Sequence, residues 1–132
     1  ERGFDVLCPH KGFTRSHTII IDVSKLGDGA SIEQKLEAAN IIANRNLLPW
    51  DKRLGRDFRK PGGLRLGTSE VTRLGMGGSE MEEIAELIKR VVIDNESPQS
   101  VAKDVAELRS GFQKVHYCFD SVRKAYDYIE IR

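Results

Sequence analysis

An apolar stripe within residues 81–92 limits most strongly how this chain can fold. Apolar side chains recur there three and four residues apart, which places them along one side of an α-helix. Ser79, followed three residues later by Glu82, has the spacing of a capping box and predicts where the helix begins. A helix of this length is stable only when its apolar side packs on something else. The chain must therefore supply a second layer.

Three short segments predict strands that could form this layer. They are residues 4–7, 18–23 and 63–67, which contain β-branched or large apolar side chains and lie beside turn-forming residues. The second segment, TIIIDV, has three consecutive isoleucines. Such a run predicts a strand that is buried on both faces.

Two further helices are expected, at residues 32–43 and 101–112. The first follows the sequence SIEQ, which has capping-box spacing, and the second follows Ser97 and Pro98, which suit the N-cap and first helical positions. Residues 120–131 could hold a short last helix or an extended segment. Strands come first and helices crowd towards the end, which predicts an α+β fold, a small sheet with helices packed on one face.

Composition narrows the class of protein further. With 132 residues, 39% of them hydrophobic, residues 1–132 are expected to form a single domain. No apolar run approaches the roughly 20 residues that span a bilayer, and no signal-peptide pattern is present, so neither membrane insertion nor secretion is expected. Cys8 and Cys118 lie far apart and outside any CxxC pattern, which favours a reducing cytoplasm.

Residue types that serve metal or phosphate chemistry are present, but their spacing does not match such sites. No two of the three histidines are four residues apart, so no metal site is predicted. The glycines of residues 75–78 do not match a phosphate-binding loop. Residues 52–60 form a basic run beside Trp50 that could contact phosphates. Acidic neighbours make a solvated loop the better interpretation and argue against nucleic acid as a partner.

Arg65 is the strongest candidate for a binding residue. It lies between Leu64 and Leu66 in a glycine-flanked apolar strand, where a charge is costly unless an anion pairs with it. One interpretation is an internal salt bridge, or an outward-facing side chain on an edge strand. The other is a guanidinium that binds a carboxylate or phosphate of a ligand.

Several segments, in the same order along the chain, resemble the serine hydroxymethyltransferase family. PGGLRLGTSEVTRLGM at residues 61–76 is similar to the family's RxGT signature near the C-terminus, and NRNLLPWD at residues 44–51 resembles its N-x-N…P-x-D segment. SHTIIIDV at residues 16–23 and EMEEIAELI at residues 80–88 resemble the family's neighbouring strand and helix. The resemblance covers most of residues 4–92.

This resemblance implies that the chain is the small C-terminal domain of an aspartate-aminotransferase-like (fold type I) pyridoxal-phosphate enzyme, with the large cofactor-binding domain absent. The whole enzyme, a cytoplasmic homodimer, would interconvert serine and glycine and pass a one-carbon unit to tetrahydrofolate or a modified tetrahydropterin. Its Schiff-base lysine would lie outside this chain, so no catalytic residue is expected here and the chain alone should be inactive. Arg65 would hold the substrate α-carboxylate, and Asn46 would lie towards the one-carbon carrier.

The chain differs from many family members at one place, and two other interpretations of its function are open. Ser69 and Glu70 stand where many members have Pro-Ala, a feature similar to the archaeal branch, and the identity of the carrier stays open. One alternative is another fold type I enzyme such as a threonine aldolase, in which an arginine also binds an amino-acid carboxylate. The other is a non-enzymatic basic interaction module built on Trp50 and the arginine-rich loop. The N-x-N and GLRLGT segments together favour the hydroxymethyltransferase.

Overall fold

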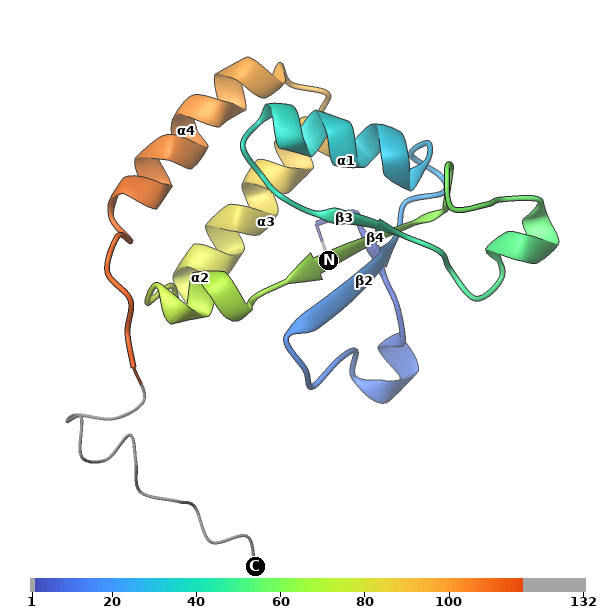
Figure 1. Ribbon diagram of the computed structural model, residues 1–132, viewed down its shortest axis with the longest axis horizontal. Coiled ribbons are helices and arrows are strands. Elements are labelled where there is room, and N and C mark those ends of the chain that lie inside the picture. Colours follow the sequence, from blue (N-terminus) through green and yellow to red (C-terminus); the bar gives the residue numbers. More distant parts are fainter. Residues whose placement is uncertain (1, 118–132) are drawn as a thin grey trace, which may run out of the picture.

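A four-stranded antiparallel sheet forms one layer of the computed structural model, which describes residues 2–117 (Figure 1). The strand order is β1-β2-β4-β3, and helices α1, α3 and α4 gather on one face of the sheet. The strands are β1 Asp5–Val6, β2 Thr18–Asp22, β3 Asn44–Asn46 and β4 Gly63–Gly67. The helices are α1 Gly29–Ala38, α2 Ser69–Arg73, α3 Gly78–Val92 and α4 Pro98–Ser110, with short 3₁₀ turns at Pro9–Lys11 and Asp51–Leu54. The predicted α+β class is confirmed.

The two long strands of the sheet present different residues to its two faces. Ile21 pairs with Leu64 on the helix side, where their exposed fractions are 4% and 0%. The adjacent pair, Ile20 with Arg65, lies on the opposite side because strand residues alternate between faces. The prediction that TIIIDV is buried on both faces is therefore wrong: within residues 2–117 no helix packs on the second face.

Helix α1 begins and ends earlier than its sequence pattern predicts. Its N-cap is Asp28, whose side chain accepts hydrogen bonds from the backbone N–H groups of Ala30 and Ser31, each at 3.0 Å. Ser31 therefore lies inside the first turn, and its hydroxyl donates to the Asp28 carbonyl at 2.9 Å. At the other end, Asn40 adopts a left-handed conformation with φ of 61°, which stops the helix and turns the chain into β3.

The remaining helix boundaries are closer to expectation. In α3 the helix starts at Gly78, and Glu80 rather than Glu82 accepts from the backbone of Gly77 at 2.6 Å. In α4 the predicted start at Ser97 and Pro98 is confirmed, and the helix ends two residues earlier than expected. The predicted last helix or extended segment at residues 120–131 lies outside the described residues. Within residues 2–117, no helix combines the length and apolar character needed to cross a bilayer.

The apolar stripe of α3 supplies the centre of the core. Its last two turns are buried against the sheet and against α1 and α4, whereas Ile84, nearer the start of the helix, is only partly buried. We expect Ile88→Ala to lower the free energy of unfolding by about 2 to 5 kcal/mol, because Ile88 is 4% exposed and its loss leaves a cavity. Urea denaturation would measure the loss. An unchanged midpoint would contradict this account of the core.

A charged cluster joins α3 to the turn that follows it and to the middle of α4. The Arg90 guanidinium donates to both carboxylate oxygens of Glu96, at 2.7 and 2.8 Å, and to Asp104 at 2.7 Å. These hydrogen bonds from Arg90 lower the pKa of Glu96 from its ordinary value of 4.5 to about 2. Because the folded-state pKa is lowered, the resulting stabilisation is present above about pH 4.5 and is lost as the pH falls towards 2.

This cluster predicts a pH-dependent difference between two variants. Glu96→Gln should lower the urea midpoint at pH 7. The difference in midpoint between this variant and the parent chain should disappear as the pH falls from about 4.5 to 2. Glu107→Gln, on α4, is the matched control, because within residues 2–117 its carboxylate takes part in no ion pair. A gap for Glu96→Gln that persists unchanged at pH 2 would contradict the assignment.

Candidate functional site

The candidate site lies on the face of the sheet opposite α1, α3 and α4. Asn44 of β3, Arg65 of β4 and Ile20 of β2 are in register and form one row across three strands. We call the surface around this row the open face, because no described helix covers it (Figure 1).

Arg65 is exposed in the middle of the open face. Its Nη2 donates to the side-chain oxygen of Asn44 at 3.1 Å, and no carboxylate within residues 2–117 forms an ion pair with it. The strand β4 is an inner strand of the sheet, so the predicted edge-strand position is wrong, as is the internal salt bridge within the described chain, whereas the outward-facing side chain is confirmed. The premise of a buried charge is also wrong, since Arg65 remains in contact with solvent here.

The guanidinium of Arg65 keeps most of its donor capacity. An arginine carries five N–H donors in a fixed fork that matches the two oxygens of a carboxylate. Only one hydrogen bond from this fork is made within the described residues, and its acceptor is the neutral amide of Asn44. The arrangement orients the guanidinium without neutralising it. Arg65 can therefore bind an anionic ligand that approaches the open face.

The second predicted residue, Asn46, lies on the same face as Arg65. It is two residues beyond Asn44 along β3, so the two side chains share a face and their Cα atoms are roughly 7 Å apart. Asn46 pairs with Gly63, and its Nδ2 donates to the carbonyl of Leu47 at 2.8 Å. The sequence analysis did not predict the contact between Asn44 and Arg65. The N-x-N spacing could have indicated it, because side chains two residues apart on a strand point to the same face.

Helix α1 fixes strand β3 from the opposite side of the sheet. Arg45, between the two asparagines, points towards α1, where its guanidinium lies 3.6 Å from the Glu33 carboxylate. The backbone N–H of Arg45 also donates to Glu33 at 3.2 Å, and the guanidinium lies 5.0 Å from the centre of the Phe58 ring. Glu33 thus holds both the backbone and the side chain of Arg45. This contact sets the position of Asn44 and Asn46 on the open face.

A buried carboxylate closes the long loop between β3 and β4. Asp51 is 0% exposed, and its Oδ2 accepts the backbone N–H groups of Leu48 at 2.9 Å and Gly62 at 2.7 Å. A Cβ atom at Gly62 would lie 2.7 Å from Asp51 Oδ1, and one at Gly63 would lie 2.5 Å from the Asn46 carbonyl. The loop therefore requires glycine at both positions. This explains the PGG sequence that precedes β4.

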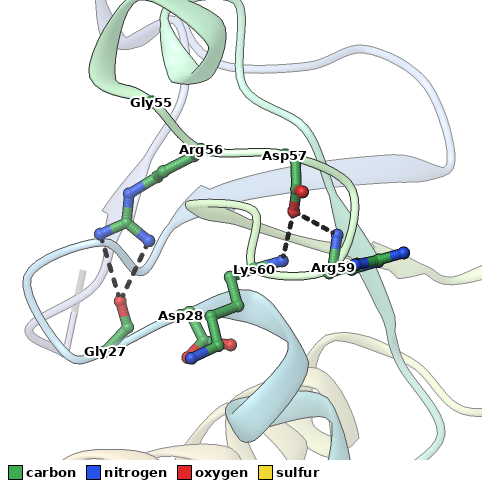
Figure 2. Close-up of a pocket in the computed structure, with 7 residues that line it drawn as sticks. All are labelled: Gly27, Asp28, Gly55, Arg56, Asp57, Arg59 and Lys60. Carbon is green, nitrogen blue, oxygen red and sulfur yellow. Dashed lines mark hydrogen bonds between the residues drawn. The ribbon is translucent and has the colours of Figure 1, made fainter.

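The basic run predicted at residues 52–60 lies in this loop and lines a pocket of about 530 Å³ (Figure 2). Arg56 reaches across the pocket to the carbonyl of Gly27 at 3.4 Å, and Asp57 accepts the backbone N–H groups of Arg59 and Lys60. Asp28 lines the same pocket, and its pKa is lowered by its hydrogen bond from the Ser31 backbone and, more weakly, by Lys60. Two carboxylates thus offset part of the positive charge.

The N-terminus of α1 adds no anion site to this pocket. The backbone N–H groups of Ala30 and Ser31 are satisfied by Asp28, and that of Gly29 donates to the Pro61 carbonyl at 2.7 Å. An anion would meet a carboxylate there instead of free donors. Arg65 is therefore the better candidate for anion binding.

Other polar residues have structural surroundings. The carbonyl of His17 accepts both the backbone N–H of Thr68 at 2.9 Å and its hydroxyl at 3.3 Å, so these two residues support the backbone where β2 pairs with β4. Among residues 2–117, no group of three His, Cys, Asp or Glu side chains is arranged to hold a metal ion. Cys8 is exposed and forms no disulfide within that range.

Comparison with known proteins identifies the family. The family model described as Serine hydroxymethyltransferase matches residues 1–88, which include the open face, the Asp51 loop and the first part of α3. The chain belongs to the serine hydroxymethyltransferase family. The resemblance drawn from the RxGT and N-x-N segments is confirmed.

Two archaeal members of this family are similar to the chain and much longer than it. It is 55% identical over 128 residues to the serine hydroxymethyltransferase of Korarchaeum cryptofilum (strain OPF8), covering 97% of this chain and 29% of that protein. It is 48% identical over 132 residues to that of Nitrosopumilus maritimus (strain SCM1), covering 100% of this chain and 30% of that protein. The chain thus spans about 30% of the length of these serine hydroxymethyltransferases. The predicted likeness to the archaeal branch is confirmed.

A solved structure agrees with the predicted fold class. The crystal structure of L-threonine transaldolase from Pseudomonas fluorescens, in its internal aldimine state, matches with a TM-score of 0.69 at 27% identity. The match covers 84% of this chain and 24% of the transaldolase chain. The chain therefore has the fold of part of a fold type I pyridoxal-phosphate enzyme, as the family resemblance implied.

Proposed function

We propose that this chain is the carboxylate-binding small domain of a hydroxymethyltransferase that interconverts serine and glycine. The observation that carries the proposal is the Arg65 guanidinium, which is oriented by Asn44 on the open face and has no anionic partner within the described residues. An amino-acid substrate offers the matching group, an α-carboxylate. The family match supplies the reaction class.

Arg65 would bind the substrate through two parallel hydrogen bonds to its carboxylate. Such a planar pair fixes both the position and the rotation of the amino acid, which a single point charge would not do. Asn44 keeps the guanidinium plane in place, and β3 is itself held by Glu33 through Arg45. The site therefore limits the orientations available to the bound serine, which lowers the entropic cost of reaching the reactive geometry.

The cofactor implied by the family would not be held by the open face. In such enzymes pyridoxal phosphate acts as an electron sink and is bound covalently through a lysine. Strands β2, β3 and β4 contain no lysine, so this face offers no amine to the cofactor. The open face therefore does not fit the cofactor's own site, which we place in the rest of the longer protein. The isolated chain should therefore be inactive.

The one-carbon carrier would approach at the Asn46 end of the open face. Asn46 lies at the strand end from which the basic loop emerges, and that loop carries an excess of arginine and lysine. A reduced pterin, either tetrahydrofolate or a modified tetrahydropterin, carries an acidic tail that would suit such a loop. We further propose a cytoplasmic homodimer as the working form of the longer protein.

The proposal is tested with the longer protein that contains this chain. Serine and pyridoxal phosphate would be supplied with tetrahydrofolate or with tetrahydromethanopterin, and glycine formation measured for each carrier. We expect carrier-dependent glycine formation, and none from residues 1–132 alone under the same conditions. Cleavage of threonine without any carrier-dependent use of serine would contradict the proposal and indicate an aldolase.

A further inference from the structure

A second hollow lies on the helix side of the sheet, away from the open face. We call it the apolar groove; its volume is about 540 Å³. Side chains from the sheet, α3 and α4 line most of it, and most of them are apolar. Representative lining residues are Ile19, Leu66, Ile84, Val105 and Leu108.

The apolar groove lies at the edge of the main core. Leu87 and Ile88 are buried, whereas Ile84, Val105 and Leu108 are only partly buried although they pack against the core. At the rim, Ile42 is 79% exposed. Within residues 2–117 nothing covers these side chains, and a contiguous apolar surface of this kind usually marks a binding surface.

The chain itself passes the rim of the groove after α4. The backbone N–H of His116 donates to the Arg73 carbonyl at 2.8 Å, and a Cβ atom at Gly75 would lie 2.9 Å from the His116 ring. Both contacts of His116 fall on the segment between Val71 and Met76, and these two residues line the groove. Residue 117 therefore ends the described chain beside the groove.

The rest of the chain has the length and the sequence pattern to cover the groove. Residues 118–132 would extend about 22 Å as a helix and roughly twice that as an extended segment. Val122, Ala125, Tyr126 and Ile129 recur at helical spacing, and charged residues lie between them. We propose that residues 118–132 of the same chain bind in the apolar groove through this apolar side.

The first test compares two substitutions on opposite sides of the segment. Tyr126→Asp places a charge on the apolar side, whereas Lys124→Asp, the matched control, places one on the polar side. Tyr126→Asp should raise the fluorescence of the apolar dye ANS severalfold and expose the Ile84 and Val105 methyl groups to a soluble paramagnetic agent in NMR. Lys124→Asp should leave both signals at the parent level. Equal dye binding by the parent chain and Tyr126→Asp would overturn the proposal.

A second measurement keeps the apolar side chains of residues 118–132 unchanged, so its result does not depend on whether Tyr126→Asp unfolds the chain. With Cys8 and Cys118 replaced by serine, a spin label on Asp127→Cys should broaden the methyl signals of Ile42 and Val105 but not that of Val23 at the far end of the sheet. Uniformly sharp methyl signals would overturn the proposal. Broadening that disappears on dilution, or protection of Ile84 seen only in the longer protein, would also overturn it, because the occupant would be a second copy or another domain.

Discussion

Asp51→Ala should lower the free energy of unfolding of this chain by about 2 to 6 kcal/mol. The Asp51 carboxylate is fully buried and accepts the backbone N–H groups of Leu48 and Gly62. Alanine would leave both groups without a partner, and each buried unsatisfied N–H costs about 1 to 3 kcal/mol. Because Leu48 follows β3 and Gly62 precedes β4, the loss also releases the loop that joins the two site-bearing strands.

Urea denaturation of three variants would separate this effect from a general loss of charge. Asp57→Ala is the matched control, because Asp57 also accepts two backbone N–H groups in the same loop but is exposed. Water can replace the contacts of the Asp57 carboxylate, so the urea midpoint of Asp57→Ala should stay close to that of the parent chain. Asp51→Asn keeps an acceptor for both N–H groups, so its urea midpoint should lie between those of Asp51→Ala and Asp57→Ala. A chain with Asp51→Ala that is as stable as Asp57→Ala would contradict the assigned role.

Secondary structure was predictable where one local pattern dominated. The α3 stripe, the two longer strands and the start of α4 at Ser97 and Pro98 each rest on a few neighbouring residues, and each prediction is confirmed in kind. The predicted boundaries of α1 were wrong because Asp28, and not Ser31, is the N-cap. Asp28 reaches two backbone N–H groups, and the left-handed Asn40 ends the helix, neither of which the apolar spacing reveals.

Burial of the sheet could not be predicted from its sequence. Three consecutive isoleucines indicate a strand covered on both sides, yet in residues 2–117 helices cover only one side. An apolar residue such as Ile20 on the open face is consistent with a surface that another part of a longer protein covers. For Arg65 the sequence left an outward-facing side chain and a ligand-paired guanidinium both open, and the structure shows the side chain exposed.

Arg65 was predictable from its place in an apolar strand, whereas Asn46 was predictable only through the family resemblance. Arg65 and Asn46 belong to segments separated by a long loop, so spacing alone could not bring them together. The register of β3 with β4 does so, because it pairs Asn44 with Arg65 and Asn46 with Gly63. The buried role of Asp51 was also invisible in the sequence, since an aspartate at the start of a basic run is most simply read as solvated.

Arg65→Ala, made in the longer protein, should lower kcat/KM for serine by about two to three orders of magnitude. A charge-assisted contact contributes about 1.5 to 3 kcal/mol, and leaving a buried carboxylate unpaired raises the loss to about 3 to 5 kcal/mol. Each 1.36 kcal/mol corresponds to about a tenfold change in rate. Arg65→Lys should also be poor, because an ammonium keeps the charge but loses the two-point contact with a carboxylate.

Two further measurements separate a binding role for Arg65 from a structural one. Its side chain is exposed and makes one hydrogen bond in the isolated chain, so Arg65→Ala should change the urea midpoint of residues 1–132 very little. Cofactor absorbance of the longer protein should also survive, since the open face offers no lysine. Lys103→Ala, which removes an exposed cation on α4 outside the open face and the basic loop, is the control for lost positive charge and should keep serine kinetics near the parent level. Near-normal kcat/KM for serine in Arg65→Ala would refute the assignment. A large loss of stability in the isolated chain would show instead that Arg65 holds the sheet together.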